Sequence, residues 1–282
     1  MTKPKKQHYV PRFYLRNFKD NNHKNDLINC FNVKEKKAYK SLIKNVAQSK
    51  YFYESPKYYL ESQLSDIEKE SSKYINNLVR NKKYGYLNAS SVRANLSYYL
   101  SLQFVRTKDK REWIKNNSLE LKEELIQEIE IPSKFQDLFD ELPNEEHVKD
   151  WHMENIVKLS KKFSKYFYYR KWILIKNKTK LNFWTSDNPI LLWNPVNPPG
   201  LGQDNTFVFF PLSPKLYLCL ADATKFSNLN QPVRNTSISS NISHATYFNL
   251  VDGIDIKEIN YLQAKNCYLN VFSKDCDFNY LD

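Results

Sequence analysis

The chain opens on an aromatic and basic segment, Gln7-His8-Tyr9-Val10-Pro11-Arg12-Phe13-Tyr14-Leu15-Arg16-Asn17-Phe18. Pro11 fixes its own φ and favours an extended conformation for the residue before it, so His8 leaves the turn at a defined angle. After Pro11 we predict one short turn of helix that buries aromatic rings and leaves Arg12 and Arg16 on one side. This N-terminal hook either fills a core groove with its rings, or presents its imidazole and guanidinium groups at a site.

Further short motifs follow along the chain, and the hook and these motifs carry a resemblance. They are Gln103-Phe104-Val105-Arg106-Thr107, Thr185-Ser186-Asp187-Asn188-Pro189, Phe210-Pro211-Leu212-Ser213-Pro214 and a last one within 260–273. In this order they resemble an uncharacterised, mainly bacterial family catalogued as domain of unknown function 4238. The resemblance extends over almost the whole chain. Since that family has no settled activity, the resemblance implies a fold unit and not a reaction.

Composition excludes several classes of protein. With 4 glycines in 282 residues, neither a G-x-G-x-x-G nor a G-x-x-x-x-G-K-[ST] loop for nucleotides occurs. No apolar run approaches the roughly 18 residues of a membrane span, and no apolar stretch follows the first lysines as in a secretory signal. Four scattered cysteines without a C-x-x-C pair indicate free thiols, and we expect a cytoplasmic protein.

Positive charge is concentrated in parts of the chain. The formal net charge is +12, and residues 1–50 hold 13 Lys and Arg against 3 Asp and Glu. This segment and the basic stretch 158–180 predict one positive face for nucleic acid. AT-rich codon usage is the alternative explanation for many lysines, so arginines, 8 of the 43 basic residues, are more informative. The predicted nucleic-acid contacts are Lys5, Lys6, Arg16, Arg111 and Arg170.

Periodicity predicts an α+β fold with long helices in the N-terminal and central part, packed on a mixed or antiparallel sheet built mainly from the C-terminal half. We expect one two-lobed domain over 1–282, with a basic hook and hairpin (1–55), a helical lobe (56–168) and a sheet lobe (169–282). The predicted helices cover 57–81, 90–107 continuing into 113–131 with a break near Lys108, 145–166 and 256–267. The predicted strands cover 26–32, 36–40, 172–175, 182–185, 206–210, 216–220 and 268–272.

Two polar residues interrupt the apolar face of the second predicted helix. The stripe formed by residues 92, 96, 99 and 100 continues to Gln103 and then to Arg106. A buried amide or guanidinium without a partner costs at least ~1–3 kcal/mol. We therefore expect Gln103 and Arg106 to meet either an internal carboxylate, in an ion pair with an aspartate, or an anionic ligand in a cleft.

The Thr185–Pro189 motif places a carboxylate and an amide where a strand ends. Asp187 and Asn188 are ordinary turn formers, but strand ends are also where rigid scaffolds present catalytic groups. If the protein binds a metal such as Mg²⁺, Asp187 is the candidate ligand. The nuclease pattern of an Asp followed by Glu-x-Lys is not matched, and His147 and His152 lack metal-ligand spacing, so no cofactor is evident.

The function favoured by these features is a nucleic-acid-directed, nuclease-like effector in bacterial phage defence, a hydrolase with a polar site in a basic cleft. Its predicted catalytic residues are His8, Arg12, Gln103, Arg106, Asp187 and Asn188, with His8 as general acid or base and an arginine stabilising the phosphorane. One alternative is a non-catalytic nucleic-acid or partner-binding module in which these residues form a buried network. Another is an enzyme that acts on a small anionic metabolite.

Overall fold

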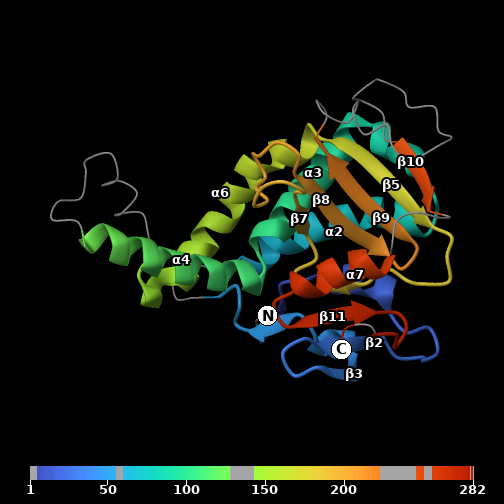
Figure 1. The fold of residues 1–282 in the computed structure, drawn as a ribbon, viewed down its shortest axis with the longest axis horizontal. Helices are drawn as coiled ribbons and strands as arrows, with labels where there is room; N and C mark the ends of the chain where they lie inside the picture. Colours follow the sequence, from blue (N-terminus) through green and yellow to red (C-terminus); the bar gives the residue numbers. More distant parts are fainter. Residues whose placement is uncertain are drawn as a thin grey trace.

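A computed structural model describes residues 5–54, 60–127, 143–222, 246–250, 256–279 and 281 (Figure 1). The side chains of 119, 121–127 and 246–250 are outside this description, as are the ends of the helices predicted over 57–81 and 113–131. The α-helices are α1 (Arg12–Leu15), α2 (Glu61–Val79), α3 (Ser90–Val105), α4 (Lys108–Gln127), α6 (Val148–Tyr168) and α7 (Ile256–Lys265). The 3-10 helices are η1 (Arg16–Phe18), η2 (Ile43–Asn45), η3 (Tyr84–Asn88) and η4 (Glu145–His147).

The strands form three sheets. They are β1 (Lys6–His8), β2 (Leu27–Asn32), β3 (Lys37–Leu42), β4 (Gln48–Lys50), β5 (Lys171–Asn177), β6 (Thr185–Ser186), β7 (Leu191–Trp193), β8 (Phe207–Ser213), β9 (Leu216–Ala221), β10 (Thr246–Leu250) and β11 (Asn270–Ser273). The strand orders are β1-β4, β10-β5-β9-β8-β7 and β3-β2-β11-β6. Only the β10–β5 pair is parallel among the described pairs. The expected α+β class is confirmed.

The helices follow the predicted periodicity. The apolar residues of α2, among them Leu64, Ile75 and Leu78, lie on one buried face. The break expected near Lys108 falls at Arg106 and Thr107, between α3 and α4. In Figure 1, α4 and the N-terminal part of α6 project from the body of the molecule.

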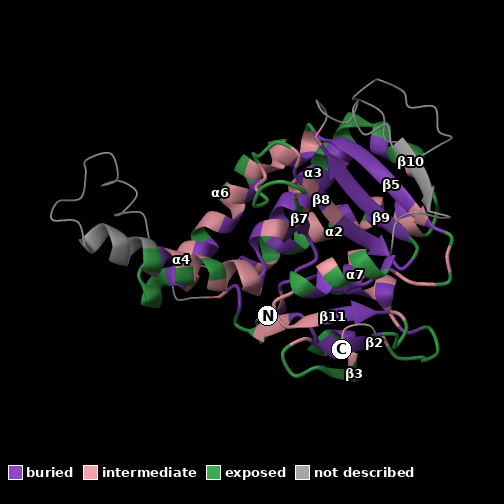
Figure 2. Cartoon of the chain, in the orientation of Figure 1, coloured by how far each residue is buried: buried purple, intermediate pink, exposed green. Residues whose placement is uncertain are grey.

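The five-stranded sheet carries the main core. Its central strands β5, β8 and β9 are almost wholly buried, as the purple strands of Figure 2 show. One sheet face packs with α2, α3 and α6 and with the rings of the hook, in a cluster that includes Tyr14, Tyr99 and Phe210. The opposite face packs against α7 through Ile256. A sheet buried on both faces explains why its strands read as continuous apolar runs.

The four-stranded sheet joins the two ends of the chain. The β2–β3 hairpin pairs with β11, so that Cys30 lies opposite Phe272, and β11 also pairs with the short strand β6. The predicted strand over 182–185 is therefore shorter than expected and begins at Thr185. Phe31, Trp184 and residues of α7 and the C-terminal segment form a small separate core beneath this sheet.

The hook is anchored chiefly by its buried aromatic rings. The Tyr14 hydroxyl donates to the Pro211 carbonyl at 2.7 Å and lies 2.7 Å from the Thr185 Oγ1. Its ring stacks on Phe210. The rings of the hook therefore fill a groove in the core, which was one of the two interpretations of the sequence. The polar side chains His8 and Arg12 line a cavity.

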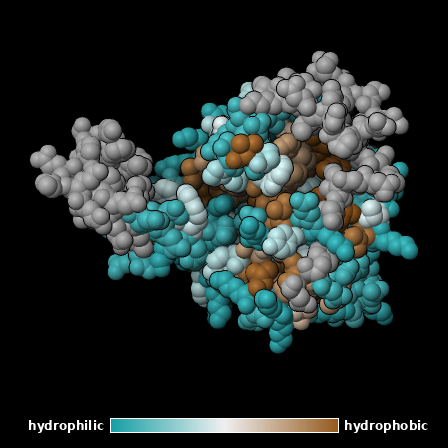
Figure 3. Space-filling view, viewed as in Figure 1, coloured by the Kyte–Doolittle hydropathy of each residue, from teal (hydrophilic) through white to brown (hydrophobic). Residues whose placement is uncertain are grey.

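The surface view adds two observations. Figure 3 shows that hydrophilic side chains prevail along the margin of the molecule where the β2–β3 hairpin lies. Among the described helices, none combines the length and the hydropathy that crossing a lipid bilayer requires.

Candidate functional site

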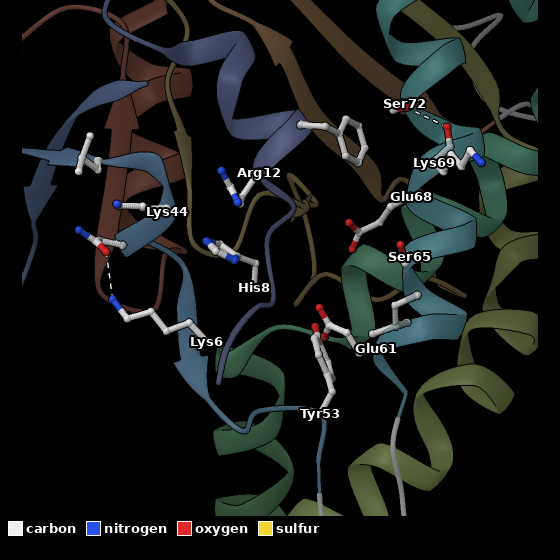
Figure 4. Close-up of a pocket in the computed structure, with 14 residues that line it drawn as sticks. Lys6, His8, Arg12, Lys44, Tyr53, Glu61, Ser65, Glu68, Lys69 and Ser72 are labelled. Atoms are coloured by element: carbon white, nitrogen blue, oxygen red, sulfur yellow. Dashed lines mark hydrogen bonds between the residues drawn. The ribbon is translucent and has the colours of Figure 1, made fainter. Parts of the chain in front are cut away.

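A cavity of about 860 Å³ lies between the hook and α2. This volume falls in the usual range of small-molecule sites, ~300–1,000 Å³. Figure 4 shows basic side chains of the N-terminal region on one wall and side chains of α2 on the other. The residues that matter for its chemistry are Lys6, His8, Arg12 and Lys44 on the first wall, and Tyr53, Glu61 and Glu68 on the second.

His8 contributes a neutral imidazole. Burial, aided by the positive charges of Arg12 and Lys6, lowers the His8 pKa to about 4. The Nε2 atom lies 3.4 Å from the Ile43 carbonyl. Because a carbonyl only accepts, Nε2 carries the proton and Nδ1 is left as an acceptor. At neutral pH His8 is therefore unprotonated, and its Nδ1 can accept a hydrogen bond.

Arg12 is exposed at the N-terminus of α1 and makes no ion pair with any residue that the structure describes. Two exposed lysines, Lys6 and Lys44, line the cavity with it. Lys6 lies opposite Lys50 in the β1–β4 pair and donates to the Asn45 Oδ1 at 3.0 Å. We call the lysines that surround β1 the basic rim: Lys5, Lys6, Lys44 and Lys50.

The opposite wall carries two carboxylates. Glu61 and Glu68 are seven residues apart, two turns along α2, and so lie on the same face. Burial raises the pKa of Glu61, and the negative charge of Glu68 acts in the same direction. Glu61 has no hydrogen-bond partner among the described residues, whereas the Glu68 Oε1 accepts from the Arg106 Nη1 at 2.7 Å.

Tyr53 supplies an unpaired hydroxyl at the same wall. Its side chain is 1% exposed, and the hydroxyl has no hydrogen-bond partner in the described structure. Its backbone is held by the hook, because the Tyr53 N–H donates to the Gln7 Oε1 at 2.6 Å. Burial raises the Tyr53 pKa, so the hydroxyl stays protonated. Leaving such a group unpaired costs about 1–3 kcal/mol, which a ligand would recover.

Gln103 and Arg106 are wholly buried behind the α2 wall. The Gln103 amide donates to the Tyr9 carbonyl at 3.0 Å and accepts from the Arg106 Nε at 3.0 Å. With Glu68 this gives an internal ion pair, although the acid is a glutamate and not the aspartate that the sequence suggested. The positive charge of Arg106 contributes to lowering the His8 pKa.

Asp187 and Asn188 are framework residues in this structure. The Asp187 carboxylate accepts the backbone N–H groups of residues 268–270 at 2.8–3.0 Å. Burial raises its pKa to about 7, while the three N–H donors act in the opposite direction. The Asn188 side chain donates to the Asp109 carboxylate and to the Asn266 carbonyl, each at 3.0 Å. Both side chains are nearly inaccessible to solvent.

Three arginines predicted to contact nucleic acid make internal contacts. Arg16 pairs with Asp26 at 2.8 Å, and Arg170 donates to the carbonyls of Tyr166, Leu201 and Thr206. Three guanidinium nitrogens of Arg170 are therefore in use, whereas Arg16 pairs through its Nε and its side chain is 39% exposed.

Arg111 is likewise engaged, between α4 and α6. It donates to the Phe52 carbonyl and to the Nδ1 of His152, each at 3.0 Å. His152 is buried, its Nε2 donates to the Val105 carbonyl, and burial lowers its pKa to about 3. Both ring nitrogens of His152 therefore have a hydrogen-bond partner within the protein.

The structure thus brings the motifs together but divides the predicted catalytic residues. His8 and Arg12 line the cavity, whereas Gln103, Arg106, Asp187 and Asn188 are buried in hydrogen-bond networks. No group of three or more His, Cys, Asp or Glu suited to hold a metal occurs in the described part of the chain, and both Asp187 oxygens accept N–H groups.

The sequence interpretation missed Tyr53, Glu61 and Glu68. A signal was present, because Glu61 and Glu68 lie three and four residues from Leu64, on the edge of the apolar stripe of α2. Gln103 and Arg106 were singled out as polar residues on the apolar face of a helix, and the same reasoning applies to Glu61 and Glu68.

Comparison with known proteins gives one match. The family described as Protein of unknown function (DUF4238) matches residues 6–277. The chain belongs to this family. All the motifs that carried the DUF4238 resemblance lie inside the matched range, as do both walls of the cavity. No curated protein and no solved structure matches the chain.

Proposed function

We propose that the protein is a nucleic-acid-directed, nuclease-like hydrolase whose active site is the cavity between the hook and α2. The observation that carries the proposal is a neutral imidazole and an unpaired guanidinium that face two carboxylates across this cavity. Groups whose pKa values are perturbed by burial and by specific charges in a cleft are typical of catalytic sites.

The proposed reaction uses two side chains and water. The His8 Nδ1 takes a proton from the attacking hydroxyl, whose oxygen bonds to phosphorus as the bond to the leaving oxygen breaks. The leaving oxygen takes its proton from a water molecule. Arg12 binds the non-bridging oxygens and stabilises the charge that develops on them.

The basic rim favours a polymer over a small molecule. Its exposed lysines continue from the cavity along β1 and β4, and can follow a phosphate backbone. A small anionic metabolite is the alternative substrate for the same cavity, and salt separates the two. Binding of a polymer weakens steeply as salt rises, whereas binding of an enclosed small anion weakens much less.

The test is cleavage of labelled single-stranded RNA and DNA by the purified chain. We expect His8→Gln and Arg12→Gln each to lower the rate by about 10²-fold or more, with unfolding midpoints near that of the parent. The matched control is Arg80→Gln, an exposed arginine beyond the end of α2. Absence of cleavage, or an equal loss in the control variant, would overturn the proposal.

The proposal gives Gln103, Arg106, Asp187 and Asn188 no catalytic role and leaves them as framework residues.

The proposal also includes a role as an effector in phage defence. A comparison of plaque counts on cells that carry the parent or the Arg12→Gln variant tests this role separately.

A further inference from the structure

The basic wall of the cavity and the Glu61 carboxylate on α2 do not neutralise each other. Arg12 forms no ion pair and Glu61 no hydrogen bond within the described part of the chain, although both line the same cavity. In Figure 4 the basic side chains and the α2 carboxylates face each other across open space. A ligand that satisfies both walls must bring acceptor oxygens to Arg12 and N–H donors to Glu61.

Tyr53 lies on the Glu61 side of the cavity, where the N–H donors of the ligand are expected. Its buried hydroxyl is directed into the cavity on the Glu61 side and lacks a partner in the described structure. The Gln7 contact to its backbone holds this residue in place. A fixed hydroxyl beside a carboxylate is suited to read a flat polar edge that carries donors next to an acceptor.

We propose that this corner binds the Watson–Crick edge of a guanine, with the attached phosphate at Arg12 and the basic rim. The inference rests on the proposed function, in that it names the nucleotide that enters the same cavity. Guanine donates two adjacent N–H groups, from N1 and N2, which match the two oxygens of the Glu61 carboxylate. Its O6 lies next to them on the same edge and can accept from the Tyr53 hydroxyl.

The other bases fit this corner less well. Adenine and cytosine each present one amino donor beside a ring-nitrogen acceptor, which a carboxylate repels. Uracil and thymine present one N–H between two carbonyl acceptors. A site built to accept two N–H donors discriminates strongly against ligands that lack one of them, because its buried acceptors are then left unpaired.

The test is calorimetric titration with guanosine, inosine and adenosine 5′-monophosphates. We expect the guanine nucleotide to bind at least tenfold more tightly than the inosine nucleotide, which lacks only the 2-amino group, and than the adenine nucleotide. Glu61→Gln should abolish this preference while leaving weak binding through the phosphate. Tyr53→Phe should weaken guanine binding severalfold.

Tyr217→Phe is the matched control. Tyr217 is also fully buried with an unpaired hydroxyl, but it belongs to the core between the five-stranded sheet and α7, away from the cavity. Equal affinity for the three nucleotides, no binding of any, or an unchanged preference in Glu61→Gln would overturn the inference.

A second measurement separates this inference from the proposed function. If only the guanine inference fails, oligonucleotides without guanine are bound and cleaved as well as those that contain it. If only the nuclease proposal fails, oligonucleotides are not cleaved, while the preference for the guanine mononucleotide and its dependence on Glu61 persist.

Discussion

Asp187 illustrates at the scale of single residues how a functional-looking motif can serve the framework. Its carboxylate accepts three part-buried N–H groups where the chain enters β11. We expect Asp187→Ala to leave these donors unpaired and to cost about 3 kcal/mol or more of unfolding free energy. Urea denaturation measures this loss, with the exposed Asp277→Ala as control. An unchanged midpoint for Asp187→Ala would contradict the framework role.

His152 makes the stability of the fold depend on pH. Its pKa is about 3 in the folded chain and about 6.5 when unfolded, so the unfolded state takes up a proton first as the solution is acidified. The stability that the neutral His152 contributes is present above pH 6.5 and is lost as pH falls from 6.5 towards 3.

We therefore predict that, between pH 7 and pH 4.5, acidification lowers the melting temperature of the parent more than that of His152→Gln. Differential scanning calorimetry at several pH values measures it. His147→Gln, an exposed histidine five residues earlier, should keep the parental slope of melting temperature against pH. The same slope in both variants would exclude His152 as the titrating group.

Single residues also show where sequence reasoning ends. The position of Arg106 on an apolar face predicts that it needs a partner, because burying an unpaired charge is costly. That the partner is Glu68 depends on how α2 packs beside α3, which no local pattern encodes. The cavity residue Tyr53 was missed for the same reason, whereas Glu61 carried a local signal at the edge of the apolar stripe of α2.

Among the secondary-structure elements, the helices were predictable and the sheet partners were not. A long helix repeats its apolar positions many times, so α2, α3 and α6 are visible in the sequence. The β2–β3 hairpin is likewise local. Its pairing with β11 joins Cys30 to Phe272, more than 240 residues away, and nothing in either strand specifies the other.

The β1–β4 pair supplies Lys6 and His8 to the basic wall of the cavity, and it contains a like-charge contact. Lys6 and Lys50 are directly opposite each other in the pair, an arrangement that destabilises a sheet. We predict that Lys50→Glu stabilises the fold by about 0.5 kcal/mol and weakens binding of single-stranded nucleic acid. Lys50→Gln should fall between the parent and Lys50→Glu in both respects.

Thermal unfolding and fluorescence anisotropy with a labelled oligonucleotide measure the two effects. Loss of stability in Lys50→Glu would show that Lys6 and Lys50 do not repel each other. Unchanged oligonucleotide affinity would remove Lys50 from the proposed interface.

At the scale of the whole molecule, the question is which part of the surface carries the excess positive charge, given a net charge of +12. The expected single positive face combines residues 1–50 with 158–180. Arg170 and Lys171 are buried, and 171–177 forms an inner strand of the five-stranded sheet, so the second stretch offers mainly the exposed lysines at the C-terminal end of α6. The basic rim, in contrast, adjoins the cavity.

The last prediction compares two triple variants that remove the same charge. Lys5, Lys44 and Lys50 of the basic rim are changed to Gln in one, and Lys161, Lys162 and Lys165 of α6 in the other. Each lysine that contacts a phosphate contributes about one unit to the slope of log affinity against log salt. We expect the rim variant to lose about two to three units of slope and the α6 variant to keep the parental slope. If both variants lose affinity equally, long-range attraction by net charge explains the binding, and the basic rim is not the interface.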